Sequence, residues 1–273
     1  MQQISNLREI QLIQIEILKY FKSVCEKHGI RYYLSNGTLL GAVKYHGFIP
    51  WDDDIDVFIP RSDYKRLIRL PEFTDGQYVL LSDNRTPGWI YPYSKLSDST
   101  TYVREGAYNL GVNYGISIDL FPLDAWRGSK CRSRFQALRC GLLRRFLAAS
   151  VSESFQTPKT GTAKLILFLI WRFSRLVGSQ RLRHALLREI ESVRNEKSPR
   201  FVGSVAWSLY GVREVIPADV FSEQITLMFE GEAYQAPAGY DMYLRSLYND
   251  YTQDLPPEKQ VPHHSMTAWR LSD

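Results

Sequence analysis

The segment FIPWDDDIDVFIP, from Phe48 to Pro60, carries four aspartates within five positions between two apolar runs. Carboxylates this close repel one another, and burial makes each charge costlier. Alternate side chains of a strand share one face, so Asp54 and Asp56 would point the same way. The intervening Ile55 would then point into the core. Two carboxylates on one rigid edge favour a hard cation, Mg²⁺ or Mn²⁺, that also binds substrate phosphates. An exposed acidic turn is the alternative.

The composition is that of a globular protein. The chain has 273 residues, of which 44% are hydrophobic and 23% charged. Three cysteines without metal-ligand spacing fit a reducing compartment. The amphipathic N-terminus carries Glu9 and Glu16 and is no secretory signal. No apolar run reaches the roughly 18–20 residues that span a bilayer. We expect a cytoplasmic protein, peripheral on the inner face of the cytoplasmic membrane.

Hydrophobic periodicity and turn residues predict a mixed α/β order of elements. Helices are expected over residues 5–28, 39–46, 62–70 and 239–249, with Gly29 ending the first. Strands are expected over residues 30–34, 55–59, 78–82, 90–96, 100–104, 114–120, 212–216 and 225–236. Residues 130–196 read as two or three further helices. The expected fold is therefore an α/β (α+β) fold with a mixed sheet, flanking helices and an inserted helical block.

Charged residues are distributed unevenly along this chain. From Arg127 to Arg200 there are 17 Lys and Arg against four acidic residues, and the rest of the chain is net acidic. A basic stretch with interleaved apolar residues fits an exposed helical face, contact with an anionic membrane surface, or nucleic-acid binding. No recognised nucleic-acid motif supports the last, and we expect no nucleic-acid partner.

Two further features stand beside the aspartate run. Gly37 and Thr38 follow an apolar run and precede a helix, where free backbone N–H groups favour phosphate. A plain turn is the alternative for this pair. Asp119 lies in the apolar segment ISIDLF, where a charge requires a partner, and it is the best candidate for a third carboxylate. Asp124 is expected to be a turn or cap residue.

Four collinear segments carry a family resemblance: residues 32–64, YPYSKLSDSTT at 91–101, GISIDLFPLD at 115–124, and the tail from Tyr240 to His264. They resemble the LicD family, which includes bacterial phosphorylcholine transferases and relatives of the fukutin-type ribitol-phosphate transferases. The resemblance implies a nucleotidyltransferase-like catalytic core at 1–127, a basic helical insertion at 128–200, and a segment at 201–273 that completes the catalytic domain. Asn36 and Asn249 stand where many relatives have glycine, and we expect both turns to survive.

The resemblance also implies roles for individual residues. Asp54 and Asp56 would hold the metal, and Asp119 would be its third ligand or a general base. Substrate contacts are implied for Gly37, Thr38, Lys95, Asp53, His263 and His264. Gly37 and Thr38 would cradle the donor phosphates, whereas the role of Asp53 is left open. The alternative for Lys95 is an ordinary solvated lysine on a strand. The alternative for each of the two histidines is a surface position without a substrate contact.

The implied reaction is transfer of a phospho-alcohol from a CDP-activated donor. Phosphorylcholine is the first choice, and ribitol, glycerol and ethanolamine phosphate are the other groups considered. The acceptor would be a hydroxyl of a cell-surface glycan or its lipid-linked oligosaccharide precursor, and CMP would be released. Nucleotidyl transfer with release of pyrophosphate is the first alternative. A metal-dependent glycosyltransferase and a non-catalytic scaffold of the same fold are the others.

Overall fold

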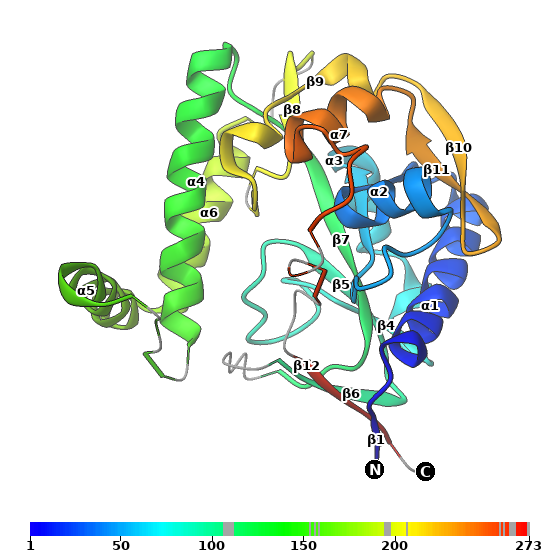
Figure 1. Cartoon of the computed structure of the whole chain (residues 1–273), viewed down its shortest axis with the longest axis horizontal. Coiled ribbons are helices and arrows are strands. Elements are labelled where there is room, and N and C mark those ends of the chain that lie inside the picture. Colours follow the sequence, from blue (N-terminus) through cyan, green and yellow to red (C-terminus); the bar gives the residue numbers. More distant parts are fainter. Residues whose placement is uncertain are drawn as a thin grey trace.

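The computed structural model describes residues 1–105, 112–152, 154–155, 157, 159–193, 198–205, 207–256, 258, 260–261 and 266–271 (Figure 1). Its helices are α1 Leu7–His28, α2 Asn36–Tyr45, α3 Arg61–Leu67, α4 Lys130–Val151, α5 Gly161–Val177, α6 Ser179–Glu191 and α7 Tyr240–Tyr248. Its strands are β1 Gln2–Ile4, β2 Tyr33–Leu34, β3 Asp56–Pro60, β4 Tyr78–Leu81, β5 Ser94–Asp98, β6 Thr101–Glu105, β7 Ser117–Ala125, β8 Phe201–Gly203, β9 Ile216–Pro217, β10 Gln224–Phe229, β11 Glu232–Pro237 and β12 Met266–Arg270. The predicted mixed α/β fold is confirmed.

A mixed sheet forms the centre, with its strands in the order β2-β3-β7-β5-β4. The β3–β7 pair is parallel, whereas β2–β3, β5–β7 and β4–β5 are antiparallel. The short strands β8 and β9 extend the far end of β7. A three-stranded sheet, β1-β12-β6, joins both ends of the chain, and β10 and β11 form a hairpin. The parallel pair matters most, because β3 and β7 carry the aspartates singled out above.

Helix α1 forms because its apolar residues recur at helical spacing and both its ends are capped. Asn6 accepts a hydrogen bond from the N–H of Arg8, and Gly29 ends the helix in the left-handed conformation. The helix packs against β5 and β7. Two glutamines on its buried side, Gln11 and Gln14, reach the loop before β3. The first helix therefore supports the aspartate segment directly.

Helices α4, α5 and α6 form a layer beside the sheet (Figure 1). Ser129 caps the start of α4. A second apolar cluster, separate from that of the sheet, joins α4 and α6 to Trp126, Val205 and Val215. The indole N–H of Trp126 donates to the backbone oxygen of Glu214 at 2.9 Å, which joins the end of β7 to the 3₁₀ helix Gly211–Glu214. Among the described helices, none is long and apolar enough to cross a bilayer.

Three expectations about local structure were wrong. Strand β7 begins at Ser117 and runs through Pro122 to Ala125, so Asp124 is a buried strand residue. The Arg61 guanidinium donates to both Asp124 carboxylate oxygens, at 2.6 and 2.5 Å, and this paired charge is what permits its burial. The segment 211–214 is a 3₁₀ helix that begins at Gly211, φ +60°, and only β9 follows it as strand. The strand expected at 30–34 is reduced to β2.

Candidate active site

Three charged residues stand in one row across the central sheet. Asp56 on β3 lies opposite Asp119 on β7, and Asp119 lies opposite Lys95 on β5. Residues in register on adjacent strands share a face of the sheet. The third carboxylate thus comes from a neighbouring strand, where the sequence had placed it. Hydrogen bonding between the strands fixes the spacing of the row.

Lys95 is buried rather than solvated, which excludes the alternative of an exposed strand lysine. Its Nζ lies 2.6 Å from Oδ1 of Asp119. The ammonium also lies 5.8 to 5.9 Å from the ring centroids of Tyr91, Tyr93 and Tyr114. The buried positive charge is therefore balanced by a carboxylate and surrounded by ring faces.

The start of α2 is fastened to the first residue of β3. The N–H of Asp56 donates to Thr38 Oγ1 at 2.8 Å, and the Asp56 carbonyl accepts from the N–H of Ser35 at 3.0 Å. The helix begins at Asn36, three residues earlier than expected, and Asn36 adopts φ +45°. Since Thr38 is buried against the backbone of β3, its hydroxyl holds the two elements together.

Gly37 occupies the closest approach between α2 and the aspartate run. A Cβ built on Gly37 would lie 2.5 Å from Oδ2 of Asp52, so a larger residue would displace that carboxylate. Asn36 beside it accepts a hydrogen bond from the hydroxyl of Tyr243 at 2.8 Å. The Asn36 side chain also hydrogen-bonds the Asp56 carboxylate. This first turn of α2 thus contacts two of the four aspartates.

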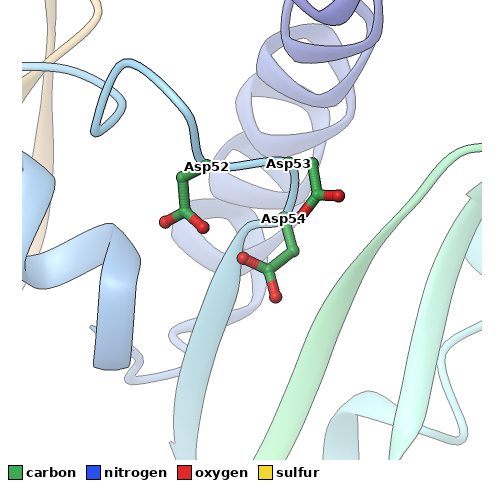
Figure 2. A group of neighbouring side chains, drawn as sticks. All are labelled: Asp52, Asp53 and Asp54. Carbon is green, nitrogen blue, oxygen red and sulfur yellow. The ribbon is translucent and has the colours of Figure 1, made fainter. Parts of the chain in front are cut away.

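Figure 2 shows Asp52, Asp53 and Asp54 on the loop that leads into β3. One carboxylate oxygen from each lies within 4.8 Å of the others. Two amides of α1 hold this loop by its backbone: Gln11 donates to the Asp52 carbonyl at 2.8 Å, and Gln14 donates to the Asp53 carbonyl at 2.9 Å. The backbone of the acidic loop is therefore held by α1.

The acidic group fits a divalent cation. Burial raises the pKa of Asp56 well above its usual value, and the negative charges of Asp54 and Asp119 raise it further. A bound cation would relieve this repulsion, and carboxylate oxygens are the ligands that Mg²⁺ and Mn²⁺ prefer. Asp54 belongs both to the triplet Asp52–Asp54 and to the surroundings of Asp56. Asp52 also belongs to both, so the triplet and the surroundings of Asp56 form one acidic group.

A cavity of about 600 Å³ opens onto this row. Its charged end is formed by Asp52, Asp54, Asp56, Lys95 and Asp119, and by Asn36 and Gly37 of α2. Its other walls are largely aromatic and apolar, and they include Trp51, Tyr91, Tyr93, Phe121, Trp207, Tyr210, Tyr248 and Tyr251. The volume and the mixed lining are typical of a small-molecule site.

Part of the aromatic wall is a packed cluster of three rings. Tyr91 and Tyr93 lie 5.0 Å apart between centroids, and Trp207 lies 5.1 and 5.4 Å from them. From α4, the guanidinium of Arg144 lies 5.8 Å from the Trp207 ring. The helical layer therefore contributes directly to the cavity wall.

The structure thus brings together Gly37, Asp53, Asp54, Asp56, Lys95 and Asp119, and it places Thr38 beneath them. His263 and His264 lie outside the described residues. Sequence reasoning missed Asn36 as a contact of Asp56, and it missed the support from Gln11 and Gln14. Gln11 and Gln14 are buried amides at helical spacing in α1. That spacing was the only signal in the sequence that could have indicated their support of the aspartate loop.

Comparisons with known proteins agree with this geometry. Residues 29–133 match the family model described as "LicD/FKTN/FKRP, nucleotidyltransferase domain". The chain is 28% identical, over 97% of its own length and 98% of the relative's, to the lipopolysaccharide cholinephosphotransferase LicD of Haemophilus influenzae. It is 44% identical over 48 residues, 18% of this chain and 10% of the relative, to the ribitol 5-phosphate transferase FKRP of mouse and of human. Residues 29–133 are thus similar to the LicD family model, and nearly the whole chain is similar to one protein of that name.

Proposed function

We propose that this protein is an enzyme that transfers a phospho-alcohol, phosphorylcholine in the first instance, from a CDP-activated donor to a glycan hydroxyl. The observation that carries the proposal is the row Asp56–Asp119–Lys95 at the charged end of the cavity. Its support from similarity is the full-length match to a protein named as a lipopolysaccharide cholinephosphotransferase. The acceptor would be a cell-surface glycan or its lipid-linked oligosaccharide precursor.

The bonds exchanged follow from this chemistry. An acceptor hydroxyl oxygen bonds to the phosphorus that carries choline, and the bond from that phosphorus to the bridging oxygen of the donor diphosphate breaks. CMP leaves with the bridging oxygen, and the hydroxyl proton passes to a carboxylate. Mg²⁺ or Mn²⁺, held by Asp54, Asp56 and Asp119, would neutralise charge on the diphosphate and on the leaving CMP.

The chain's own residues supply the remaining functions. Lys95 is placed to bind a phosphate oxygen, because its ammonium lies in the row and already pairs with a carboxylate. Asp119, as a metal ligand or as general base, faces the same space. Gly37 leaves room for the Asp52 carboxylate beside the first turn of α2, whose N–H groups favour phosphate. Asn36 orients Asp56 through their hydrogen bond.

The aromatic walls favour a quaternary ammonium group over a polyol. A trimethylammonium ion is attracted to ring faces within about 6 Å, and it needs no hydrogen-bond partner. Tyr91, Tyr93 and Trp207 line the same cavity as the acidic row, and the cations that lie over them, Lys95 and Arg144, show that these rings accept positive charge. Lys95 would repel a second cation, but Asp119 neutralises it at 2.6 Å. Choline is for this reason placed before ribitol and glycerol.

Product analysis tests the proposal. With a CDP-alcohol, Mg²⁺ and a glycan acceptor, the enzyme is expected to form CMP and a phospho-alcohol-substituted glycan in equal amounts. The matched domain's description as a nucleotidyltransferase favours one second candidate, in which a nucleotide is added to the acceptor. That reaction would consume CTP and release pyrophosphate. A protein that binds CDP-alcohols without forming either product would be a scaffold.

A further inference from the structure

Helix α5 exposes an apolar face. Leu165, Ile166, Leu169, Phe173 and Leu176 are between 56% and 79% exposed. At 3.6 residues per turn these positions fall on one side of the helix. A face of large apolar side chains is costly in water and marks a surface that something else covers.

The helix is held in place despite this exposure. Phe173 packs edge to face on Phe146 of α4, with ring centroids 6.1 Å apart. Arg175 donates to the carbonyl oxygen of Ser152 at 3.0 Å. On the inner side Ser174 is buried, and Trp171 meets Phe155 at 6.1 Å. Leu165, Ile166, Leu169 and Leu176 take no part in these contacts and stay exposed. Figure 1 shows α5 at the edge of the molecule, beside α4.

Helix α4 continues the exposed face. Phe135, Leu138 and Leu142 are exposed, and their spacings of three and four residues place them on one side of α4 in line with Phe146. Phe146 is the residue that contacts α5. We call this combined surface of α4 and α5 the apolar face. It extends over two helices of the same layer.

Charge identifies what could cover the apolar face. The stretch from Arg127 to Arg200 has 17 basic against four acidic residues. Arg132, Arg145, Lys164 and Arg172 on α4 and α5 are exposed. Apolar side chains flanked by basic ones are the pattern of helices that lie in the interface of an anionic membrane. A second copy of this chain would carry the same positive charge and be repelled.

The opposite side of α4 lines the catalytic cavity. Arg144, Leu147, Ala148 and Val151 contribute to its wall. Arg144 follows Leu142 by two residues, which is about 200° around a helix. One helix, roughly 10 Å across, thus separates the apolar face from the cavity. A lipid surface on one side of α4 would lie close to the substrate on the other.

We propose that the apolar face lies on an anionic bilayer surface and that the acceptor is a lipid-linked glycan drawn from it. Leu165 and Leu169 insert among the acyl chains, and the basic residues contact anionic headgroups. The membrane part of this proposal depends only on the apolar face of α4 and α5, whereas the acceptor part rests on the proposed function. An acceptor anchored in the same bilayer would reach the cavity across α4 without leaving the membrane.

The first test is flotation of the whole chain with vesicles of phosphatidylglycerol and phosphatidylcholine, compared with phosphatidylcholine alone. Binding to the anionic vesicles is expected at low salt, with a marked decrease at high salt. The double variant L165E/L169E should bind about tenfold more weakly or worse. A matched control, L12E/M228E, alters exposed apolar residues on α1 and β10 and should bind as the parent does.

Thermal midpoints of both variants, with and without CDP-choline and Mg²⁺, show whether they fold and keep the donor site. Absence of vesicle binding by a folded parent would overturn the membrane proposal. So would light scattering that shows a dimer which L165E/L169E dissolves, since the occupant would then be a second copy. A parent without any CDP-alcohol response would instead count against the proposed function, with vesicle binding unaffected.

The acceptor part is tested with lipopolysaccharide in the anionic vesicles and with its delipidated core oligosaccharide. L165E/L169E is expected to lose turnover on the membrane-bound acceptor and to retain it on the free oligosaccharide. Equal turnover of parent and variant on the membrane-bound acceptor would overturn the lipid-linked assignment. Product from neither acceptor with the parent enzyme would overturn it as well.

Discussion

In the central sheet, Asp56 and Lys95 are charged and buried, whereas in α5 Leu165 and Leu169 are apolar and exposed. Each region therefore reverses the usual distribution of residue types. In the sheet, strand register and hydrogen bonds hold the charges where a substrate would complete their pairing. In the helical layer, packing on α4 holds the apolar face where a lipid surface would cover it. The first departure lies in the cavity wall, and the second lies on the helical layer whose α4 lines the same cavity.

The largest effect is expected from replacing Asp56 with Asn. Turnover should fall by about 10³-fold or more, roughly 4 kcal/mol in the activation barrier, because a central carboxylate of the row is lost. The metal-free variant should nevertheless melt no lower than the parent. The folded-state pKa of Asp56 is raised, so its contribution to stability is lost as pH rises through that pKa, and removing the charge relieves repulsion. Steady-state kinetics and calorimetry at pH 8 measure the two effects. A variant that stays active, or that melts well below the parent, would contradict the account of the sheet.

Replacing Lys95 with Met should reduce turnover by roughly 10²-fold, because it removes a buried ammonium from the proposed phosphate site. Donor affinity, measured by calorimetry with CDP-choline and Mg²⁺, should fall as well. Lys19→Met is the matched control, since Lys19 pairs with Glu16 at the surface. Unchanged kinetics for Lys95→Met would show that the lysine only balances Asp119.

Replacing Trp207 with Leu should weaken CDP-choline binding by roughly threefold to thirtyfold, since a ring face is lost from the cavity. Binding of CDP-glycerol should change little, because a polyol gains nothing from that face. Titration calorimetry with both donors gives the ratio. An equal loss for the two donors would show that Trp207 shapes the cavity without selecting the cation.

A further effect concerns stability away from the acidic row. Burial raises the pKa of Glu214 to about 7, and its carboxylate accepts from the N–H of Tyr210 at 2.8 Å. A raised folded-state pKa gives stability that is complete below pH about 4.5 and is lost as pH rises through about 7. The free energy of unfolding of Glu214→Gln should therefore exceed that of the parent by roughly 1–3 kcal/mol at pH 8, with little difference at pH 5. Denaturant melts at both pH values measure this, and an equal effect at both would refute the assignment.

The two regions also differ in how far the sequence predicts them. The aspartate run, the strand after it and the carboxylate at Asp119 follow from local alternation and from the improbability of a charge in an apolar segment. The helices of the layer follow from periodicity, and the basic stretch with its interleaved apolar residues was visible in the sequence. What the sequence could not show is that the two sides of α4 differ, since that depends on how α5 and the sheet pack against it.

Long-range contacts account for the rest of what was missed. Asn36 is held by Tyr243, 207 positions away, and no local pattern links them. Asn36 and Asn249, which stand where many relatives have glycine, both adopt positive φ, at 45° and 61°. Asp124 was misplaced because Pro122 suggested a turn, whereas the ion pair with Arg61 supports a longer strand. The division at residues 127 and 200, and the roles of the site residues, stay predictions.

The most direct measurement of the central claim is a product analysis by mass spectrometry. The whole chain is incubated with Mg²⁺, delipidated lipopolysaccharide core oligosaccharide, and either CDP-choline or CTP. The account predicts CMP and an oligosaccharide heavier by one phosphorylcholine group from CDP-choline, and no product with Asp56→Asn. Pyrophosphate and a nucleotide-bearing oligosaccharide from CTP, or an Asp56→Asn variant that forms the phosphorylcholine product, would contradict it.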